Sequence, residues 1–329
     1  MKFPLILAAA LVCQAMLLAQ ENPPPTPASR VVATATSGIF RVASDGKITP
    51  LDLPKGTVTG GGGPQGTTDP QVSPDGKLIA FIHRGSLKIR PVQGGEAISV
   101  VSGYLHELLL ITGWSADSGN LVYFLGPPQA DDAPPSKVTE EKQFVYDLKD
   151  RAKREISING TVVGWLPGGE MLVQNLEEGT ISSQSLIAHA KPKVLLKDTA
   201  GYGQIILSPD GKELAVSSSK PNDTSSSQLL RVELATGKTT PITKPGAWAE
   251  FQWPKWSLSG KQLAWFAQVS FKEGIPKSVL VVEGKTVSKP AQVFEFFWLT
   301  ESIIILQEQQ AIVVLDITTG KELGRKATK

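Results

Sequence analysis

Short apolar runs alternate with tight polar turns along most of this chain, and the spacing between the turns repeats. The turn Ser73-Pro74-Asp75-Gly76-Lys77 precedes the apolar run Leu78–Ile82, and the same five residues recur at 208–212 before another apolar run. Weaker copies of the turn begin at Ser115, Leu166, Ser257 and Leu299, so that successive turns start 42 to 51 residues apart. A period of about 40–50 residues is typical of one four-stranded propeller blade.

Each unit is predicted to contain four strands. A short first strand leads into the Ser-Pro-Asp-Gly turn, and a near-continuous apolar second strand follows it. Third and fourth strands are joined by a second turn signal, which occurs as Ser44–Lys47, Gly94–Glu96, Thr236–Lys238 and Thr319–Lys321. Continuous apolar strands are typical of sheets buried on both faces. The pattern therefore predicts an all-β fold, a β-propeller of four-stranded antiparallel blades.

The number of blades depends on the first unit. Counting one period back from Ser73 reaches Val31, after which strands are predicted over 31–35, 38–43 and 47–53. The innermost strand of that unit would fall in the stretch Pro23–Pro27, where missing N–H groups oppose pairing. We therefore predict seven blades, the first lacking or borrowing its inner strand, with six blades as the alternative.

Tryptophan recurs at one position of the repeat. Each copy ends a first strand, immediately before the turn, at Trp114, Trp165, Trp256 and Trp298. One equivalent residue per blade indicates packing between neighbouring blades rather than a cage around a ligand.

The N-terminus has the pattern of a secretory signal peptide. Lys2 provides the positive charge, residues 3–18 form the apolar segment, and Ala19 precedes the preferred cleavage site. We expect a signal peptide over 1–19, a proline-rich leader over 20–30 and a single propeller domain over 31–326. Cleavage removes Cys13, the only cysteine, so the mature chain would hold no disulfide. The predicted location is exported, either periplasmic or extracellular.

Charge narrows the classes of partner. The 33 basic and 31 acidic residues give a net charge of +2, and the sequence has no block of Lys or Arg. This balance does not favour a nucleic acid or an anionic membrane as partner. No apolar run after the signal is long enough to span a membrane. Without a nucleotide, metal or cofactor motif, the sequence predicts neither a cofactor nor a metal.

The run from Ser73 to Phe81, and its counterpart at 208–216, resembles the WD40-like repeats of the periplasmic TolB family. The propellers of prolyl-oligopeptidase and dipeptidyl-peptidase relatives are similar. The resemblance covers residues 31–326 at the level of fold, and because the shared residues belong to turns and core it implies no activity. This sequence has only a leader where TolB carries an α/β domain, and it lacks the Gly-x-Ser-x-Gly elbow of the peptidases.

Loop lengths vary on one face of the predicted ring. We call it the connection face, because it holds the connections between blades together with the loops between second and third strands. The opposite face, the turn face, holds the short turns. The long segments on the connection face are Lys55–Thr68, Gly126–Thr139, Ser217–Ser227 and Ser270–Lys277. Propellers usually bind through such elaborated loops, so we expect the functional site on this face.

The connection face also collects the candidate ligand-binding side chains at the mouth of the channel. Aromatic groups there would suit a sugar or a peptide, whereas histidine beside glutamate would suit acid–base chemistry. No catalytic residue is assigned. The candidates are His83, Arg84, Tyr104, His106, Glu107, Asp198, Tyr202, Trp248 and Glu250.

Three functions are open on the sequence alone. The first is an exported, non-enzymatic scaffold that binds a protein partner in the cell envelope. The second is a carbohydrate- or peptide-active lyase or hydrolase that uses His83, His106 and Glu107 at the channel mouth. The third is a binder of a glycan or peptide ligand that uses the aromatic candidates.

Overall fold

The computed structural model describes residues 29–34, 38–55, 57, 62–63, 66–68, 70–103, 107–127, 140–186, 191–220, 223–244, 252–272 and 275–327. The regular elements in these ranges are all β-strands. The described residues therefore contain no helix that could cross a membrane. The predicted signal peptide, residues 1–19, lies outside the described residues.

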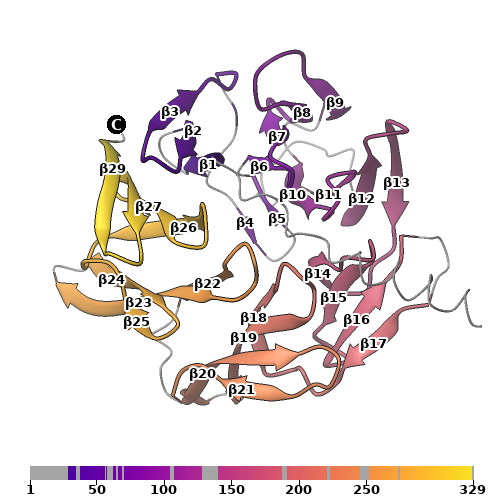
Figure 1. Ribbon diagram of the computed structural model, residues 1–329. Helices are drawn as coiled ribbons and strands as arrows, with labels where there is room; N and C mark the ends of the chain where they lie inside the picture. Colours follow the sequence, from indigo (N-terminus) through magenta and orange to yellow (C-terminus); the bar gives the residue numbers. More distant parts are fainter. Residues whose placement is uncertain are drawn as a thin grey trace, which may run out of the picture.

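Most strands belong to six antiparallel blades arranged around a ring (Figure 1), each with its four strands in sequence order from the centre outward. The bounds are Gln71–Val72, Leu78–His83, Ser86–Pro91 and Ile98–Val101 for β6–β9; Leu108–Trp114, Asn120–Gly126, Lys142–Asp147 and Ala152–Ile156 for β10–β13; Thr161–Trp165, Met171–Asn175, Thr180–Gln184 and Lys193–Leu196 for β14–β17; Tyr202–Leu207, Glu213–Lys220, Asp223–Glu233 and Thr239–Pro241 for β18–β21; Gln252–Trp256, Leu263–Lys272, Ile275–Val282 and Lys285–Thr286 for β22–β25; and Val293–Trp298, Ile303–Glu308, Ala311–Asp316 and Lys321–Ala327 for β26–β29.

A further sheet of three strands lies between the blades β26–β29 and β6–β9 (Figure 1). It consists of β1 (Ser29–Thr34), β2 (Gly38–Ala43) and β3 (Ile48–Leu51), with β1 nearest the centre of the ring. Among the described residues the four-stranded blades therefore number six, the alternative count rather than the preferred seven, and the unit predicted to lack its inner strand has three strands there. The sequence reason for expecting no inner strand is the proline in the stretch before β1, because proline has no N–H to give to a strand ladder.

The glycine-rich segment Lys55–Thr68 departs from the prediction of a long loop. It contains two short strands, β4 (Gly62–Gly63) and β5 (Gly66–Thr67), and Thr67 pairs with Ile111 of β10. The hairpin thus extends the sheet β10–β13 to six strands. Because β10 is the innermost strand of its blade, the hairpin lies toward the centre of the ring (Figure 1). The sequence prediction missed it because glycine is depleted in ordinary strands.

Hydrogen bonds within the turn explain why Ser-Pro-Asp-Gly recurs. Ser73 Oγ donates to Asp75 Oδ1 (2.6 Å) and accepts from the backbone N–H five residues further on (2.9 Å). The Asp75 carboxylate also accepts from the N–H of Lys77 (3.1 Å), while Gly76 takes a φ of +73° that a side chain would oppose. The copy at 208–213 repeats these bonds. Both clean copies of the predicted turn are confirmed.

The repeated tryptophans pack between blades, as predicted. Trp114, Trp256 and Trp298 are nearly fully buried, and each indole N–H donates to a backbone carbonyl on the inner strand of the preceding blade. The acceptors are the carbonyl oxygens of Gln71, Ile206 and Lys255, at 3.0, 3.1 and 3.1 Å. This bond satisfies the polar end of a buried ring and fixes the spacing of neighbouring blades.

The core consists of apolar layers between adjacent blades. Ile82 and Leu87 of one blade pack with Ile111 and Leu121 of the next, and all four are buried. The three-stranded sheet joins the same system on both sides. Its Ile39 packs with β7, while Phe40 and Val42 pack with β27 and β28.

At the junction of the three-stranded sheet and β29 the backbones are in close contact. A Cβ on Gly324 would lie 2.2 Å from the carbonyl oxygen of Gly46, so no larger residue fits there without displacement.

Candidate binding site in the channel and on the connection face

Five of the nine residues proposed from the sequence belong to the described part of the chain: His83, Arg84, Glu107, Asp198 and Tyr202. The other four, Tyr104, His106, Trp248 and Glu250, lie outside the described residues.

His83 and Arg84 stand where β7 turns into β8, on the connection face. His83 is half-buried, its Nε2 lies 3.1 Å from the carbonyl oxygen of Lys55, and its backbone pairs with Thr57. Arg84 has a φ of +49° in the tight turn. These contacts give His83 a structural role, because they hold the segment that follows β3 against the end of β7.

Asp198 and Tyr202 flank the connection between β17 and β18. Asp198 is exposed with a φ of +58°, while Tyr202 is half-buried and its carbonyl accepts a bond from Gln174 Nε2 (3.1 Å). Burial raises the pKa of the Tyr202 phenol. Glu107 is half-buried immediately before β10. The described candidates thus fall at three separate places, the β7–β8 turn, the start of β10 and the β17–β18 connection, and no group of three metal-ligating side chains occurs among the residues that the structure describes.

Two exposed aromatic side chains on the inner strands were missed by the sequence analysis. Trp253 of β22 is 41% exposed and Phe294 of β26 is 45% exposed. Both lie in bulges, between Gln252 and Lys255 and between Val293 and Glu295. Since first strands begin at the connection face, both residues lie near the connection-face ends of their strands.

The bulges explain why these rings are exposed. A bulge adds a residue to one strand and redirects the side chains next to it, so the strict alternation of buried and exposed positions is interrupted. Trp253 has a φ of +49°, which is rare for a bulky residue, and it meets the edge of Phe266 with ring centroids 6.0 Å apart. The available sequence signal is that Trp253 stands three residues before Trp256, outside the repeated tryptophan position.

Further along the same strands, charged side chains meet an aromatic ring. Lys255 Nζ of β22 lies 2.7 Å from Glu295 Oε1 of β26, and it stands 4.4 Å from the ring centroid of Phe297. Arg30 of β1 lies 5.7 Å from the same ring and donates through Nη1 to the carbonyl oxygen of Trp298 (2.6 Å). Burial lowers the pKa of both cations, and the Glu295 carboxylate opposes that shift. We call these residues, Arg30, Lys255, Glu295 and Phe297, the channel cluster.

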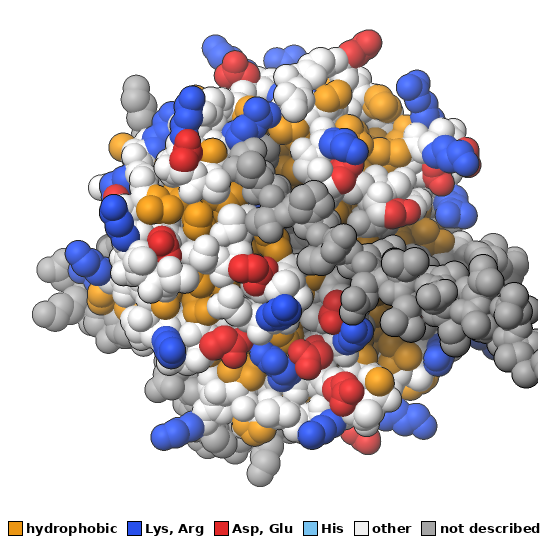
Figure 2. Space-filling model, viewed as in Figure 1, with side chains coloured by type: hydrophobic (Ala, Val, Ile, Leu, Met, Phe, Trp, Pro, Cys, Tyr) orange, Lys and Arg blue, Asp and Glu red, His pale blue; other side chains and the backbone are white. Residues whose placement is uncertain are grey.

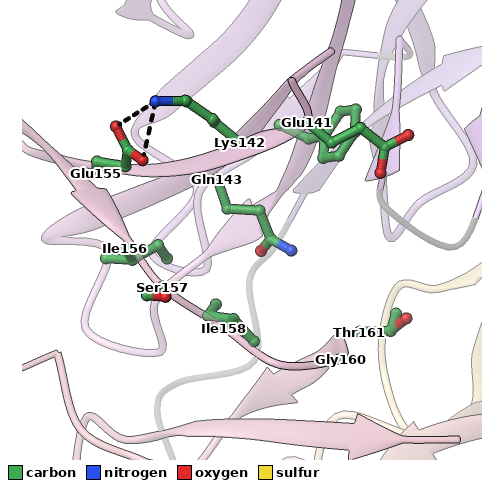
Figure 3. Close-up of a pocket in the computed structure, with 10 residues that line it drawn as sticks. Glu141, Lys142, Gln143, Glu155, Ile156, Ser157, Ile158, Gly160 and Thr161 are labelled. Atoms are coloured by element: carbon green, nitrogen blue, oxygen red, sulfur yellow. Dashed lines mark hydrogen bonds and ion pairs between the residues drawn. The ribbon is translucent and has the colours of Figure 1, made fainter. Parts of the chain in front are cut away.

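A polar pocket of about 270 Å³ lies at the boundary of the blades β10–β13 and β14–β17. Lys142 and Glu155 form an ion pair across its rim, with Nζ 3.3 Å from each carboxylate oxygen. Figure 3 shows the Gln143 side chain directed into the space between β12 and the segment from Ile156 to Thr161. The Gln143 Oε1 atom is buried and has no partner among the described residues.

The face of the molecule seen in Figure 2 shows no dominant charge. Lys and Arg side chains alternate with Asp and Glu over the face seen in Figure 2, and hydrophobic side chains appear between them. This mixture agrees with the net charge of +2.

Comparison with known proteins shows the fold. No protein-family model matches the sequence, and no curated protein matches it. Among solved structures, the chain is similar to TolB from Acinetobacter baumannii, at 17% identity over 84% of this chain and 67% of that one, with a TM-score of 0.52. It is also similar to an oligogalacturonate lyase from Vibrio parahaemolyticus, at 11% identity over 92% and 85% of the two chains and a TM-score of 0.53.

A third similar structure is the β-propeller domain of Cps50 (Swd1) from Myceliophteria thermophila, at 14% identity over 84% and 90% of the two chains and a TM-score of 0.50. The predicted resemblance to TolB-like and WD40-like propellers is therefore confirmed in fold. The neighbours include an enzyme as well as TolB, so the fold leaves the activity open.

Proposed function

We propose that this protein is an exported, non-enzymatic propeller that binds a protein partner at the mouth of its channel on the connection face. The observation that carries the proposal is the pair of exposed aromatic rings, Trp253 and Phe294, at equivalent ends of two adjacent inner strands. Aromatic side chains are enriched at the centres of protein interfaces, where they supply a large apolar contact with little loss of side-chain freedom.

The backbone strain at Trp253 supports a binding role. A tryptophan with positive φ is strained, and such strain is maintained only where the surrounding structure imposes it, commonly at functional sites. Charged groups, Lys255 and Glu295, lie further along the same two strands, so a partner segment could meet apolar and polar contacts together. This combination is typical of protein interfaces, which have an apolar centre and polar surroundings.

The experiment is a cross-linking pull-down with tagged residues 20–329 from the envelope of the source organism. The matched variants are Trp253→Ser with Phe294→Ser, and Val194→Ser as the control, since Val194 is 46% exposed on β17, the outermost strand of its blade. We expect one partner to be recovered with the wild type and the control and lost with the double variant. Recovery of every partner by the double variant would exclude the channel mouth as the docking site.

Export is tested separately by the mass of the mature N-terminus. The arrangement of Lys2, the apolar segment 3–18 and Ala19 leads us to expect a protein that starts at Gln20 and fractionates outside the cytoplasm. An intact Met1 on protein that stays in the cytoplasm would refute the exported location and leave the docking proposal to its own test.

A further inference from the structure

The channel cluster holds more positive than negative charge. Three strands of different sheets contribute its ionic groups, namely Arg30 from β1, Lys255 from β22 and Glu295 from β26. Glu295 pairs with Lys255 at 2.7 Å, whereas the recorded bond of Arg30 goes to a neutral carbonyl oxygen at 2.6 Å. Two cations and one carboxylate leave these groups with a net charge of +1.

The aromatic ring that both cations contact does not remove this excess. Lys255 Nζ and the guanidinium carbon of Arg30 lie 4.4 Å and 5.7 Å from the Phe297 centroid. The negative face of a ring attracts a cation, but the ring itself is neutral. Two cations held by one ring also repel each other, and Arg30 is among the causes that lower the pKa of Lys255, after burial.

Two side chains of the cluster are accessible, and Arg30 has donors that the described residues do not engage. The side chains of Lys255 and Glu295 are 31% and 39% exposed, so a solute in the channel can reach them. A guanidinium has five N–H donors, and among the described residues Arg30 makes one side-chain hydrogen bond, from Nη1 to the carbonyl oxygen of Trp298. Unused donors beside an uncompensated positive charge favour an anion.

We propose that the channel cluster binds a carboxylate, held between Lys255 and Arg30 on the side away from Glu295. Charge balance selects a carboxylate, because one negative charge neutralises the cluster, whereas a phosphate dianion would leave it negative next to Glu295. The carboxylate belongs either to a small organic acid or to an acidic side chain of a peptide. This site is distinct from the exposed rings of the proposed docking surface, and its test needs no partner protein.

The experiment is a calorimetric and NMR titration of the mature protein with sodium acetate, and with the peptides acetyl-Gly-Glu-Gly-amide and acetyl-Gly-Gln-Gly-amide. We expect saturable shifts of the Lys255 and Arg30 side-chain signals with the carboxylates and none with the glutamine peptide. Acetate and glutamate peptide binding equally would identify a small acid as the source, and a clear preference for the peptide would identify an acidic segment. No saturable shift with either carboxylate in the wild type would overturn the proposal without reference to any variant.

The variants give changes of opposite sign. Lys255→Met and Arg30→Met should each weaken binding at least about tenfold, because each removes a charge-assisted bond. Glu295→Gln should tighten binding by about tenfold, because it removes the carboxylate that competes for Lys255. Lys142→Met, which removes a cation from the separate pocket, is the control and should change nothing. If Glu295→Gln folds and weakens binding as the cation variants do, the cluster is only an ion pair between blades.

Discussion

Gly76 and Gly211 occupy the same position of the same five-residue turn, but only Gly211 contacts a neighbouring blade. Their φ angles are +73° and +70°. A Cβ added to Gly76 would meet nothing within 4 Å, whereas a Cβ added to Gly211 would lie 2.3 Å from Cδ and 3.0 Å from Cγ of Pro167. The pair therefore separates the cost of the turn conformation from the cost of packing one blade against the next.

The two alanine substitutions should differ by the packing cost. Gly76→Ala places an L-residue in the left-handed region, which costs about 1–2 kcal/mol. Gly211→Ala adds an overpacked contact with Pro167, worth about 1–3 kcal/mol more. At about 2 °C per kcal/mol for a domain of this size, Tm should fall by about 2–4 °C for Gly76→Ala and by about 4–10 °C for Gly211→Ala.

The assay is urea unfolding followed by circular dichroism, with the free energy compared at a common m-value. Adding Pro167→Ala to Gly211→Ala removes the Cδ and Cγ atoms in question, so this background should reduce the cost of Gly211→Ala to that of Gly76→Ala. Equal losses for the two single variants, or no relief in the Pro167→Ala background, would refute the idea that the turn at Gly211 packs closely against Pro167 of the neighbouring blade.

Three more substitutions test the contacts between and within blades. Trp298→Phe removes the indole N–H bond to a carbonyl of β22 and should lower the free energy of unfolding by about 1–2 kcal/mol in urea unfolding, so an unchanged midpoint would contradict this role. Glu301→Gln weakens the two hydrogen bonds that Glu301 accepts from Ser259 N–H and Oγ, at 2.7 and 2.9 Å. It should lower the free energy of unfolding by about 1–3 kcal/mol in the same assay, and no change would show that these turn contacts do not hold the two blades together. The Ser115 hydroxyl and a backbone N–H lower the pKa of Asp117, so Ser115→Ala should raise that pKa in an NMR titration, and an unmoved pKa would refute this cause. Because the folded-state pKa of Asp117 is the lower one, its contribution to stability is present above about pH 4 and is lost as the pH falls through the folded-state value.

The features that could be predicted from the sequence are those that depend on local chemistry. The Ser-Pro-Asp-Gly turn closes on its own hydroxyl and carboxylate, and the repeated tryptophan follows the period of the blade, so both can be read from residues close together in the chain. These two signals were sufficient for the fold class and for the position of most strands.

The contents of the channel could not be read in this way. The exposure of Trp253 and Phe294 depends on bulges set by the pairing of β22 and β26 with their neighbours, and alternation along the strand gives no sign of them. The channel cluster joins Arg30 to Lys255 and Glu295 across most of the length of the chain. Only the closure of the ring brings these side chains together.

The three-stranded sheet determines when the ring can close. On one side of this sheet, Ile39 packs against β7, which is synthesised soon after it. On the other side, Phe40 and Val42 pack against β27 and β28, which are synthesised near the end of translation. Joining these two segments closes a loop of almost the whole chain; the entropic cost grows slowly with length, but the contact is slow to form. Until the last blade is synthesised, the apolar side chains of Phe40 and Val42 remain exposed on the nascent protein. A chain truncated before β27 would leave this apolar surface exposed permanently. Loss of the C-terminal blade should therefore cause aggregation through the N-terminal three-stranded sheet.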